Sequence, residues 1–233
     1  MIPLYVATPG FAEPRESLYY MVAANGTFLV NRTALFTAVT PARSLPGLLY
    51  REPSIQLAFP RLPRQLMERI YGFFKTVYLQ WEGEAIVFLF YEPAERTFHV
   101  GVPPQTLFRH RAGDRWRTEG RVSYGYLPRA KGLIKLGDAH SHASARAFFS
   151  CRDDADDTTH DGLRIVLGQM DRRRPDVNVS FVTQGTRFLL GAADVMEDFS
   201  AALTPPRAWL RQVTCRHLGE LHEGTSQVPG GVV

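Results

Sequence analysis

The chain has 233 residues, of which 45% are hydrophobic and 21% charged, and this composition is typical of a folded soluble protein and not of a disordered one. The length suffices for one large domain, or for one domain with a substantial extension. No apolar run approaches the roughly eighteen residues that span a bilayer, and the start lacks the pattern of a signal peptide. We therefore expect a cytoplasmic protein without a membrane partner, and its two cysteines, Cys151 and Cys215, suit a reducing compartment.

The formal net charge is +4, but the arginines are scattered along the chain apart from "DRRRP" at 171–175. Because no patterned basic face is evident, we do not expect nucleic-acid binding. The chain also has no glycine-rich phosphate loop, so no nucleotide cofactor is implied.

The first 62 residues are expected to form a β-rich region. In "YYMVAANGTFLVN" the pair Asn25-Gly26 stands between two apolar runs, which is a strong signal for a hairpin. The stretches "LPGLLY" and "SIQLAF" that follow have the same character and predict further strands.

The period of the apolar residues changes at Pro63, a residue suited to the first turn of a helix. Beyond it, helical spacing predicts one amphipathic helix up to residue 81, with the apolar positions Leu66, Met67, Ile70, Phe73, Phe74, Val77 and Tyr78. Gly83 follows the helix. The apolar run "EAIVFLFY" at 84–91 then predicts a central strand, with "RTFHVGV" as its hairpin partner.

Residues 103–132 mix prolines, glycines and charges, and we expect a loop there with one short strand in "RVSYGYL". The apolar segment "GLIKLGDAHSH" comes next, and "LRIVLGQM", "VNVSFVTQ" and "TRFLLG" predict three further strands. Helical spacing returns at 194–203 and 206–219, and residues 223–233 are expected to form a flexible tail.

The stretch "AHSHASARAFFSCRDD" at 139–154 carries the chemistry. His140 and His142 are two residues apart, so on an extended strand their imidazoles point to the same side and can reach one ion. Asp153 could bring a carboxylate to the same point if the intervening residues turn back. Two nitrogens and one carboxylate oxygen suit a tetrahedral zinc ion whose fourth position is left to water, as in catalytic sites.

A zinc site that activates water needs a base, and Glu84 at the start of the buried strand is our candidate, with Glu82 as the alternative. Ser150 is placed to donate a hydrogen bond to an oxyanion on a carbonyl substrate. The same serine could instead cap a helix that begins near Asp153. Cys151 is expected to be a small buried residue and not a nucleophile.

The segment "HSHASARAFFSCRD" fits the pattern His-x-His-x7-Ser-x-x-Asp of the JAMM metalloproteases, also called MPN-plus or JAB domains. A helix followed by a strand that begins with a glutamate also resembles that family, and Glu84 precedes His140 by a similar distance to that in eukaryotic members. The segment "AFFSCRDDADD", the N-terminal hairpin and the strands in "RRRPDVNVSFVTQGTRF" resemble a bacterial branch, the PRTRC system protein A family. One departure is Ala143, which stands where most members have proline.

The resemblance implies an α/β fold of three layers, the JAMM/MPN (cytidine-deaminase-like) fold, with a mixed, largely antiparallel sheet. It divides the chain into a β-rich N-terminal region (1–62), the metalloprotease domain (63–192), a C-terminal helical region (193–222) and the tail (223–233). The site residues that it implies are zinc ligands at His140, His142 and Asp153, a general acid/base at Glu84 and an oxyanion donor at Ser150.

The implied activity is that of a zinc-dependent isopeptidase or peptidase with one catalytic zinc ion. Its substrate would be a bacterial ubiquitin-like protein, cut after its C-terminal glycine for precursor processing or deconjugation, and activating-enzyme-like proteins are expected as partners. Two alternatives from other classes are a non-catalytic MPN-type scaffold and a plasmid-associated or nucleic-acid-associated binding protein.

Overall fold

A computed structural model describes residues 2–128, 131–150 and 160–218 of the chain. The chain divides into two compact units, residues 1–54 and residues 55–233. Residues 55–62, which the sequence grouped with the N-terminal region, therefore belong to the second unit. Leu62 is fully buried there and forms an isolated parallel bridge with Met196.

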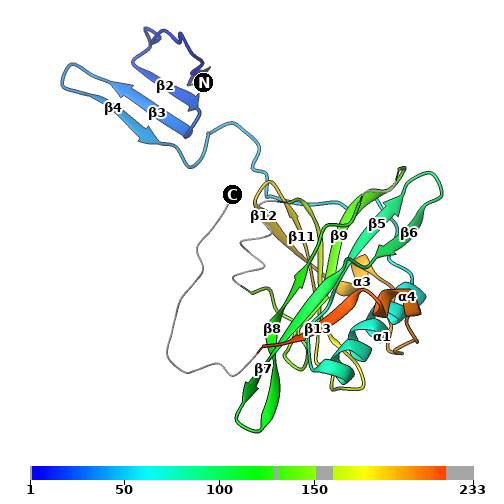
Figure 1. Ribbon diagram of the computed structural model, residues 1–233. Coiled ribbons are helices and arrows are strands. Elements are labelled where there is room, and N and C mark those ends of the chain that lie inside the picture. The colour runs from blue at the N-terminus through cyan, green and yellow to red at the C-terminus, as the bar shows by residue number, and fades with distance from the viewer. Residues whose placement is uncertain (1, 129–130, 151–159, 219–233) are drawn as a thin grey trace. The chain divides into compact units, whose positions relative to one another are not determined.

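The N-terminal unit is a sheet of four strands in the order β1-β2-β3-β4, with bounds Leu4–Val6, Leu18–Ala23, Gly26–Arg32 and Thr37–Pro41 (Figure 1). The predicted hairpin is confirmed as β2–β3, in which Ala23 pairs with Gly26 across the turn. The strands expected in "LPGLLY" and "SIQLAF" are wrong, because the chain turns at Pro46 and Gly47 and then runs on without strand pairing. Leu57 and Phe59 instead pack as extended chain against the core of the second unit.

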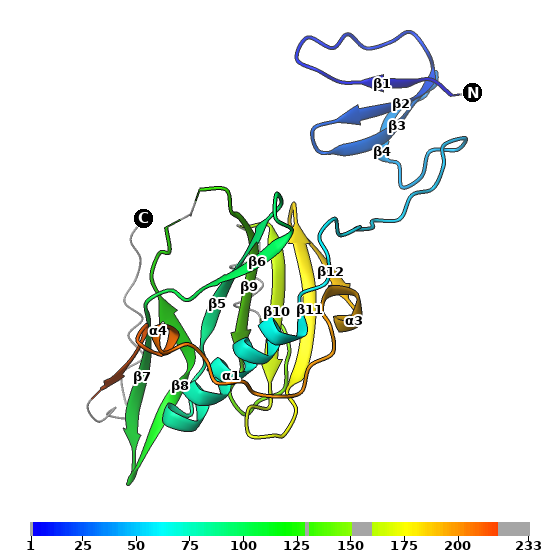
Figure 2. The same cartoon turned by 90° about the vertical axis from the view of Figure 1, so that its right-hand side faces the viewer.

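The second unit is built on a sheet of six strands in the order β12-β11-β10-β9-β5-β6 (Figures 1 and 2). Their bounds are Ile86–Glu92 for β5, Thr97–Gly101 for β6, Ile134–Ser141 for β9, Gly162–Gly168 for β10, Asp176–Thr183 for β11 and Thr186–Leu190 for β12. Only β9 and β10 pair in parallel among these neighbours, and the other pairs are antiparallel. An α/β fold with a mixed, largely antiparallel sheet is therefore confirmed, as are these six strands.

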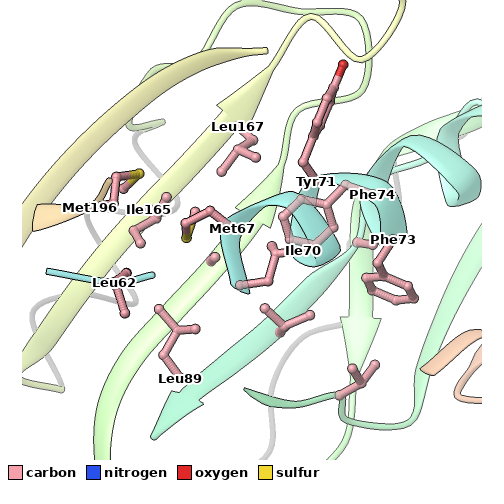
Figure 3. Packing of buried hydrophobic residues seen from close by; sticks show 14 of the residues in the cluster. Leu62, Met67, Ile70, Tyr71, Phe73, Phe74, Leu89, Ile165, Leu167 and Met196 are labelled. Carbon is pink, nitrogen blue, oxygen red and sulfur yellow. The ribbon is translucent and has the colours of Figure 1, made fainter. Parts of the chain in front are cut away.

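One face of this sheet is covered by α1 (Arg64–Trp81) (Figure 2). Its buried residues recur at helical spacing, as predicted, and they are Met67, Ile70, Tyr71, Gly72, Phe73, Phe74 and Val77. They share a hydrophobic core with Leu89, Ile165 and Leu167 of the sheet (Figure 3). Burial of each large side chain of this kind contributes about 1.5–3 kcal/mol relative to exposure, so the helix is fixed to the sheet chiefly by this face.

α1 ends at Glu82, which is in the left-handed region at φ 53° and donates its backbone N–H to the carbonyl of Tyr78. The chain can then turn directly into β5.

Gly72 has a packing role within the helix, because a Cβ there would lie 1.7 Å from the carbonyl oxygen of Leu203. The segment that contains Leu203 therefore crosses α1 at Gly72, the one residue of this helix without a side chain.

A second sheet has three strands in the order β13-β7-β8, of which β7 and β8 lie within the segment 103–132 and β13 lies where the sequence predicted a helix. The bounds are Gln105–Ala112 for β7, Arg115–Tyr124 for β8 and Val213–His217 for β13. The short strand expected in "RVSYGYL" is confirmed in its first half, which belongs to β8, but the loop expected over most of the rest of 103–132 is wrong. Arginines stand on both faces of the outer half of this ribbon, so neither face has an apolar pattern. The turn is at Gly113, whose φ is 61°.

The expected C-terminal helices are also wrong in extent. In the described part of this region, only the single turns α3 (Ala192–Val195) and α4 (Arg207–Leu210) are helical. Pro205 and Pro206 stand directly before α4 and keep the backbone there out of a helix. Trp209 packs edge-on against Phe73 of α1, with ring centroids 5.8 Å apart. Beyond α4 the chain pairs in parallel with β7 as β13, and the expected tail at 223–233 lies outside the described residues. Of the helices that the structure describes, none is long and apolar enough to cross a membrane.

Candidate functional site

The predicted histidines lie on the face of the large sheet that α1 does not cover. Ala139 of β9 pairs with Val87 and both belong to the core under α1, whereas His140 pairs with Ile86 of β5. Ile86 belongs to a separate small cluster with Phe88 and Phe90. Because side chains alternate along a strand, His140 and Asp138 share the face of that small cluster.

Glu84 is brought to the histidines by paired backbone contacts between two segments far apart in sequence. The N–H of Ala85 donates to Oγ of Ser141 at 3.0 Å, and the N–H of Ser141 donates to the carbonyl of Ala85 at 2.9 Å. Ser141 stands between the two histidines. Glu84, the residue before Ala85, is therefore held beside the end of β9. It lies two residues before the first residue of β5 and so is not part of that strand.

A buried glutamine, Gln105, also holds the start of β5 in place. Gln105, at the start of β7, accepts from the N–H of Ile86 and donates to its carbonyl, both at 3.0 Å. It is 2% exposed. These two bonds satisfy the first backbone groups of β5 and tie the three-stranded sheet to the large sheet next to Glu84.

The two histidines point their Nε2 atoms at each other. These atoms are 3.2 Å apart, and the ring centroids are 5.1 Å apart. His142 is 7% exposed and its backbone N–H donates to the carbonyl of Leu167, which holds it at the end of β10. Two nitrogens that bind one tetrahedral zinc ion at about 2.0–2.1 Å are separated by about 3.3–3.4 Å, so this pair fits two corners of such a site.

A cavity of about 260 Å³ joins the predicted residues. Glu84, His140, His142 and Ser150 all line it, although 56 residues separate Glu84 from His140 (140 minus 84). The remaining walls come from β5, β8, β9 and β10 and from the segment after His142, through Ile86, Gly120, Arg121, Val122, Tyr124, Asp138, Ala145, Phe148, Phe149 and Arg164. The structure thus brings four of the five predicted site residues to one cavity.

The fifth residue, Asp153, lies outside the described residues, as does Cys151. Within residues 2–128, 131–150 and 160–218, no group of three or more histidine, cysteine, aspartate or glutamate side chains could hold a metal ion. The donor set in that part of the chain is therefore the histidine pair. The helix that Ser150 was alternatively expected to cap lies in the same undescribed segment.

Glu82, the alternative base, has a different place from Glu84. It forms the exposed left-handed end of α1 and does not line the cavity. Neither glutamate lies within β5, which begins at Ile86. Of the two carboxylates, Glu84 is the one next to the histidines.

The aromatic residues between the histidines and Ser150 form part of the cavity wall. Phe148 is 49% exposed and meets the ring of His142 edge-on, with centroids 4.6 Å apart. The guanidinium of Arg187 lies 4.2 Å from the ring centroid of Phe149. Gly168, at the end of β10, gives this segment room, because a Cβ there would lie 2.3 Å from the backbone nitrogen of Ala147.

Ala143 has a backbone conformation that proline, the residue at this position in most JAMM metalloproteases, cannot adopt. Its φ is 46°, in the left-handed region, whereas proline is restricted to a φ near −65°. The backbone after His142 is therefore one that a proline could not adopt. Its shape is held by hydrogen bonds from the N–H of Ala145 to the carbonyl of His142 and from the N–H of Met170 to the carbonyl of Ala143.

Sequence reasoning missed three charged residues of the cavity, Arg121 of β8 and the pair Asp138 and Arg164. Nη1 of Arg164 is 3.1 Å from Oδ2 of Asp138. A signal for both was available. Asp138 precedes His140 by two residues and so had to share its face, and Arg164 is a charge inside the otherwise apolar run "LRIVLG".

No protein-family model matches the chain, and a comparison with curated proteins finds no match. Among solved structures, the chain is similar to protein DSY2949 from Desulfitobacterium hafniense, whose solution structure is known. The TM-score is 0.34 and the sequence identity 15%, over 60% of this chain and 91% of the other. A likeness at this level indicates nothing about function.

Proposed function

We propose that this protein is a zinc-dependent isopeptidase or peptidase of the JAMM type, which hydrolyses the amide bond after the C-terminal glycine of a ubiquitin-like protein. The observation that supports this most is the cavity shared by Glu84, His140, His142 and Ser150. Each of these residue types can serve metal-assisted amide hydrolysis, and Glu84 comes from a segment far from the other three in the sequence.

His140 and His142 would hold the metal through Nε2, together with a carboxylate that the motif assigns to Asp153. The separation of 3.2 Å between the two nitrogens supports zinc, since it is close to the edge of a tetrahedral zinc site. Bound zinc would supply a Lewis acid and would lower the pKa of water at that place to near neutrality.

Glu84 would carry the proton of the reaction. It takes a proton from the attacking water and delivers it to the nitrogen of the leaving amine, so that a poor leaving group departs as a neutral amine. The backbone bonds between Ala85 and Ser141 hold this carboxylate at a fixed place beside the histidines. A base that is held in place loses little entropy when the substrate arrives.

Ser150 would donate its hydroxyl proton as a hydrogen bond to the oxyanion that forms on the substrate carbonyl. A donor aimed at this charge stabilises the transition state more than the ground state, which is the condition for catalysis. Ser150 is half-buried at the cavity wall, where the low polarity of Phe148 and Phe149 would strengthen such a bond.

The substrate tail would bind in extended form along β8. This strand is at the edge of its sheet, with β7 as its one neighbour in the described part of the chain, and its residues Gly120, Arg121, Val122 and Tyr124 line the cavity. An edge strand offers backbone hydrogen bonds to an added strand. Within the segment 103–132, β8 would therefore be the part that shapes the groove for the tail.

The test is hydrolysis of a linear fusion between a bacterial ubiquitin-like protein that ends in glycine and a short peptide, measured together with zinc content. The full chain is expected to contain one zinc ion and to release the peptide after the glycine. His142→Ala is expected to lose both the metal and the cleavage. Stable zinc binding without cleavage of any such fusion would favour a non-catalytic scaffold, and a chain that binds no zinc would contradict the proposal.

A further inference from the structure

We propose that the outer half of the β7–β8 ribbon, residues 109–117, enters the major groove of duplex DNA and binds its phosphates through arginines on both of its faces. The inference is independent of the proposed hydrolysis, because none of the residues 109–117 lines the cavity. Its basis is the distribution of charge over the folded chain and the shape of the ribbon.

The positive charge of the chain is concentrated on the three-stranded sheet. Residues 105–124 and 213–217 contain six arginines and two acidic residues, Asp114 and Glu119. Their net charge of +4 (six minus two) equals the formal net charge of the whole chain, so the other residues carry as many acidic as basic groups. Other residues separate these arginines along the chain, which is why the sequence showed no basic face. Strand pairing brings them together.

Both faces of the outer half carry arginines. Arg115 and Arg117 of β8 are two residues apart and share one face. Trp116 stands between them in the sequence and so points to the opposite face. Arg111 of β7 pairs with Trp116, and Arg109 lies two residues before Arg111, so both arginines share the face of Trp116. Each face therefore has two arginines.

Backbone carbonyls hold two of the guanidinium groups against the ribbon. Nη2 of Arg109 donates to the carbonyl of Trp116 at 3.2 Å, and Nε of Arg111 donates to the carbonyl of Gly113 at 3.2 Å. A carbonyl has no net charge, so these bonds position the guanidinium groups without neutralising them. Positioned side chains lose less entropy on binding, and the planar guanidinium group fits phosphate in a bidentate geometry.

The shape of the ribbon favours a groove as its binding partner. Its end at Gly113 projects away from the large sheet and α1 (Figures 1 and 2). The major groove of B-DNA is about 12 Å wide and about 8.5 Å deep, and it admits a two-stranded β-ribbon. The major groove of A-form RNA is deep and too narrow for side chains to enter, so the duplex is DNA.

The arginines on two faces favour DNA over an acidic protein. A ribbon that enters a groove with its turn first has one phosphate backbone on each side, so the arginines of both faces meet negative charge. A flat acidic surface would contact one face of the ribbon and leave the two arginines of the other face in water. The ribbon therefore suits a partner that surrounds it.

The experiment is fluorescence anisotropy of a labelled DNA duplex of mixed sequence, titrated with the full chain at several salt concentrations. If four arginines contact phosphates, the logarithm of the binding constant should fall with the logarithm of the salt concentration with a slope of about −4. Arg115→Ala/Arg117→Ala removes the arginines of one face. It should reduce the slope to about −2 and weaken binding to all sequences alike. Both residues are exposed, so this variant should unfold at the same temperature as wild type.

Arg173→Ala/Arg174→Ala is the matched control. These two arginines are also exposed, and they lie between β10 and β11, so the variant loses the same charge at another place. It should keep the affinity and the salt slope of wild type. An equal loss in the two double variants would show that net charge alone decides binding and would overturn the inference.

Three further results would also overturn it. One is the absence of binding at about 50 mM salt, where phosphate contacts are strong. Another is equal affinity for single-stranded DNA, which has no groove. The third is competition by poly-glutamate as effective as that by unlabelled duplex, which would indicate an acidic protein as the partner of the ribbon.

Discussion

Ala85 and Ser141 exchange two hydrogen bonds, one through the serine hydroxyl at 3.0 Å and one through the serine N–H at 2.9 Å. This contact joins the residue after Glu84 to the residue between the two histidines. Ser141 is fully buried, so its side chain has a structural task and is not available to a substrate. The arrangement of the candidate site therefore depends on a serine that carries no chemistry of its own.

Ser141→Ala should lower the free energy of unfolding by about 1–3 kcal/mol, because the buried N–H of Ala85 loses its acceptor. Hydrolysis should fall as well, since Glu84 is no longer held beside the histidines. Denaturant unfolding and the rate of hydrolysis of the fusion measure the two effects separately. The exposed Ser123→Ala of β8 is the control and should stay within about 0.5 kcal/mol of wild type. Equal stability of the two variants would contradict this account.

Ala143→Pro should disrupt the segment after His142, because proline cannot adopt the φ of 46° found there. Ala143→Gly tests the same position in the opposite direction. This change removes the steric conflict between Cβ and a left-handed backbone, which costs about 1 kcal/mol. Glycine also raises the conformational entropy of the unfolded chain, which offsets part of this gain, so the variant should be at least as stable as wild type. Thermal unfolding compares the two. A proline variant as stable as the glycine variant would show that the backbone is not left-handed at this residue.

Gly168→Ala should displace the segment that carries Phe148, Phe149 and Ser150, because the added Cβ would overlap the backbone of residues 145–147. The histidines precede this segment, so we expect hydrolysis to fall more than zinc affinity. Gly125→Ala is the matched control, since a Cβ there meets the carbonyl of Pro104 at an ordinary 3.7 Å. If zinc affinity fell in proportion to hydrolysis in Gly168→Ala, the segment would not move independently of the histidines.

The hydrogen bonds of the Asp161 carboxylate predict that the free energy of unfolding depends on pH. Hydrogen bonds from the Thr183 hydroxyl and the Gln184 N–H lower the pKa of Asp161 below its ordinary value. A carboxyl group with a lowered pKa in the folded state stabilises the protein above its unfolded pKa, and this contribution is lost as the pH falls through the folded pKa. Asp161→Ala should therefore be less stable than wild type at neutral pH and should approach it at an acidic pH below the lowered pKa of this carboxyl group. Denaturant unfolding at both pH values measures this, and a constant difference would contradict it.

The large sheet and α1 could be predicted from the sequence because their patterns are simple. "EAIVFLFY" and "LRIVLG" are apolar runs of strand length, and the apolar residues after Pro63 recur with the period of a helix. Most of the ribbon of β7 and β8 could not be predicted from the sequence, because arginines stand on both faces of its outer half and neither face has an apolar pattern. The strand β13 was taken for a helix because Trp209, Leu210 and Val213 fit helical spacing, although the chain changes direction between them.

The candidate site was predictable where spacing along the chain decides it. His140 and His142 had to share a face, and Glu84 followed from its place before a buried strand. Asp138 and Arg164 each had a local signal, but their pairing could not be predicted because it depends on the register between β9 and β10. The choice between Glu82 and Glu84 likewise required the left-handed turn at the end of α1.

The most direct test of the central claim is the turnover of Glu84→Gln with a ubiquitin-like fusion, measured beside its zinc content. The account predicts that zinc remains bound and that kcat falls by about 10²- to 10⁴-fold, the usual effect of losing a general acid/base. Glu82→Gln, at the exposed end of α1, should keep wild-type turnover. Turnover near the wild-type rate in Glu84→Gln would contradict the account.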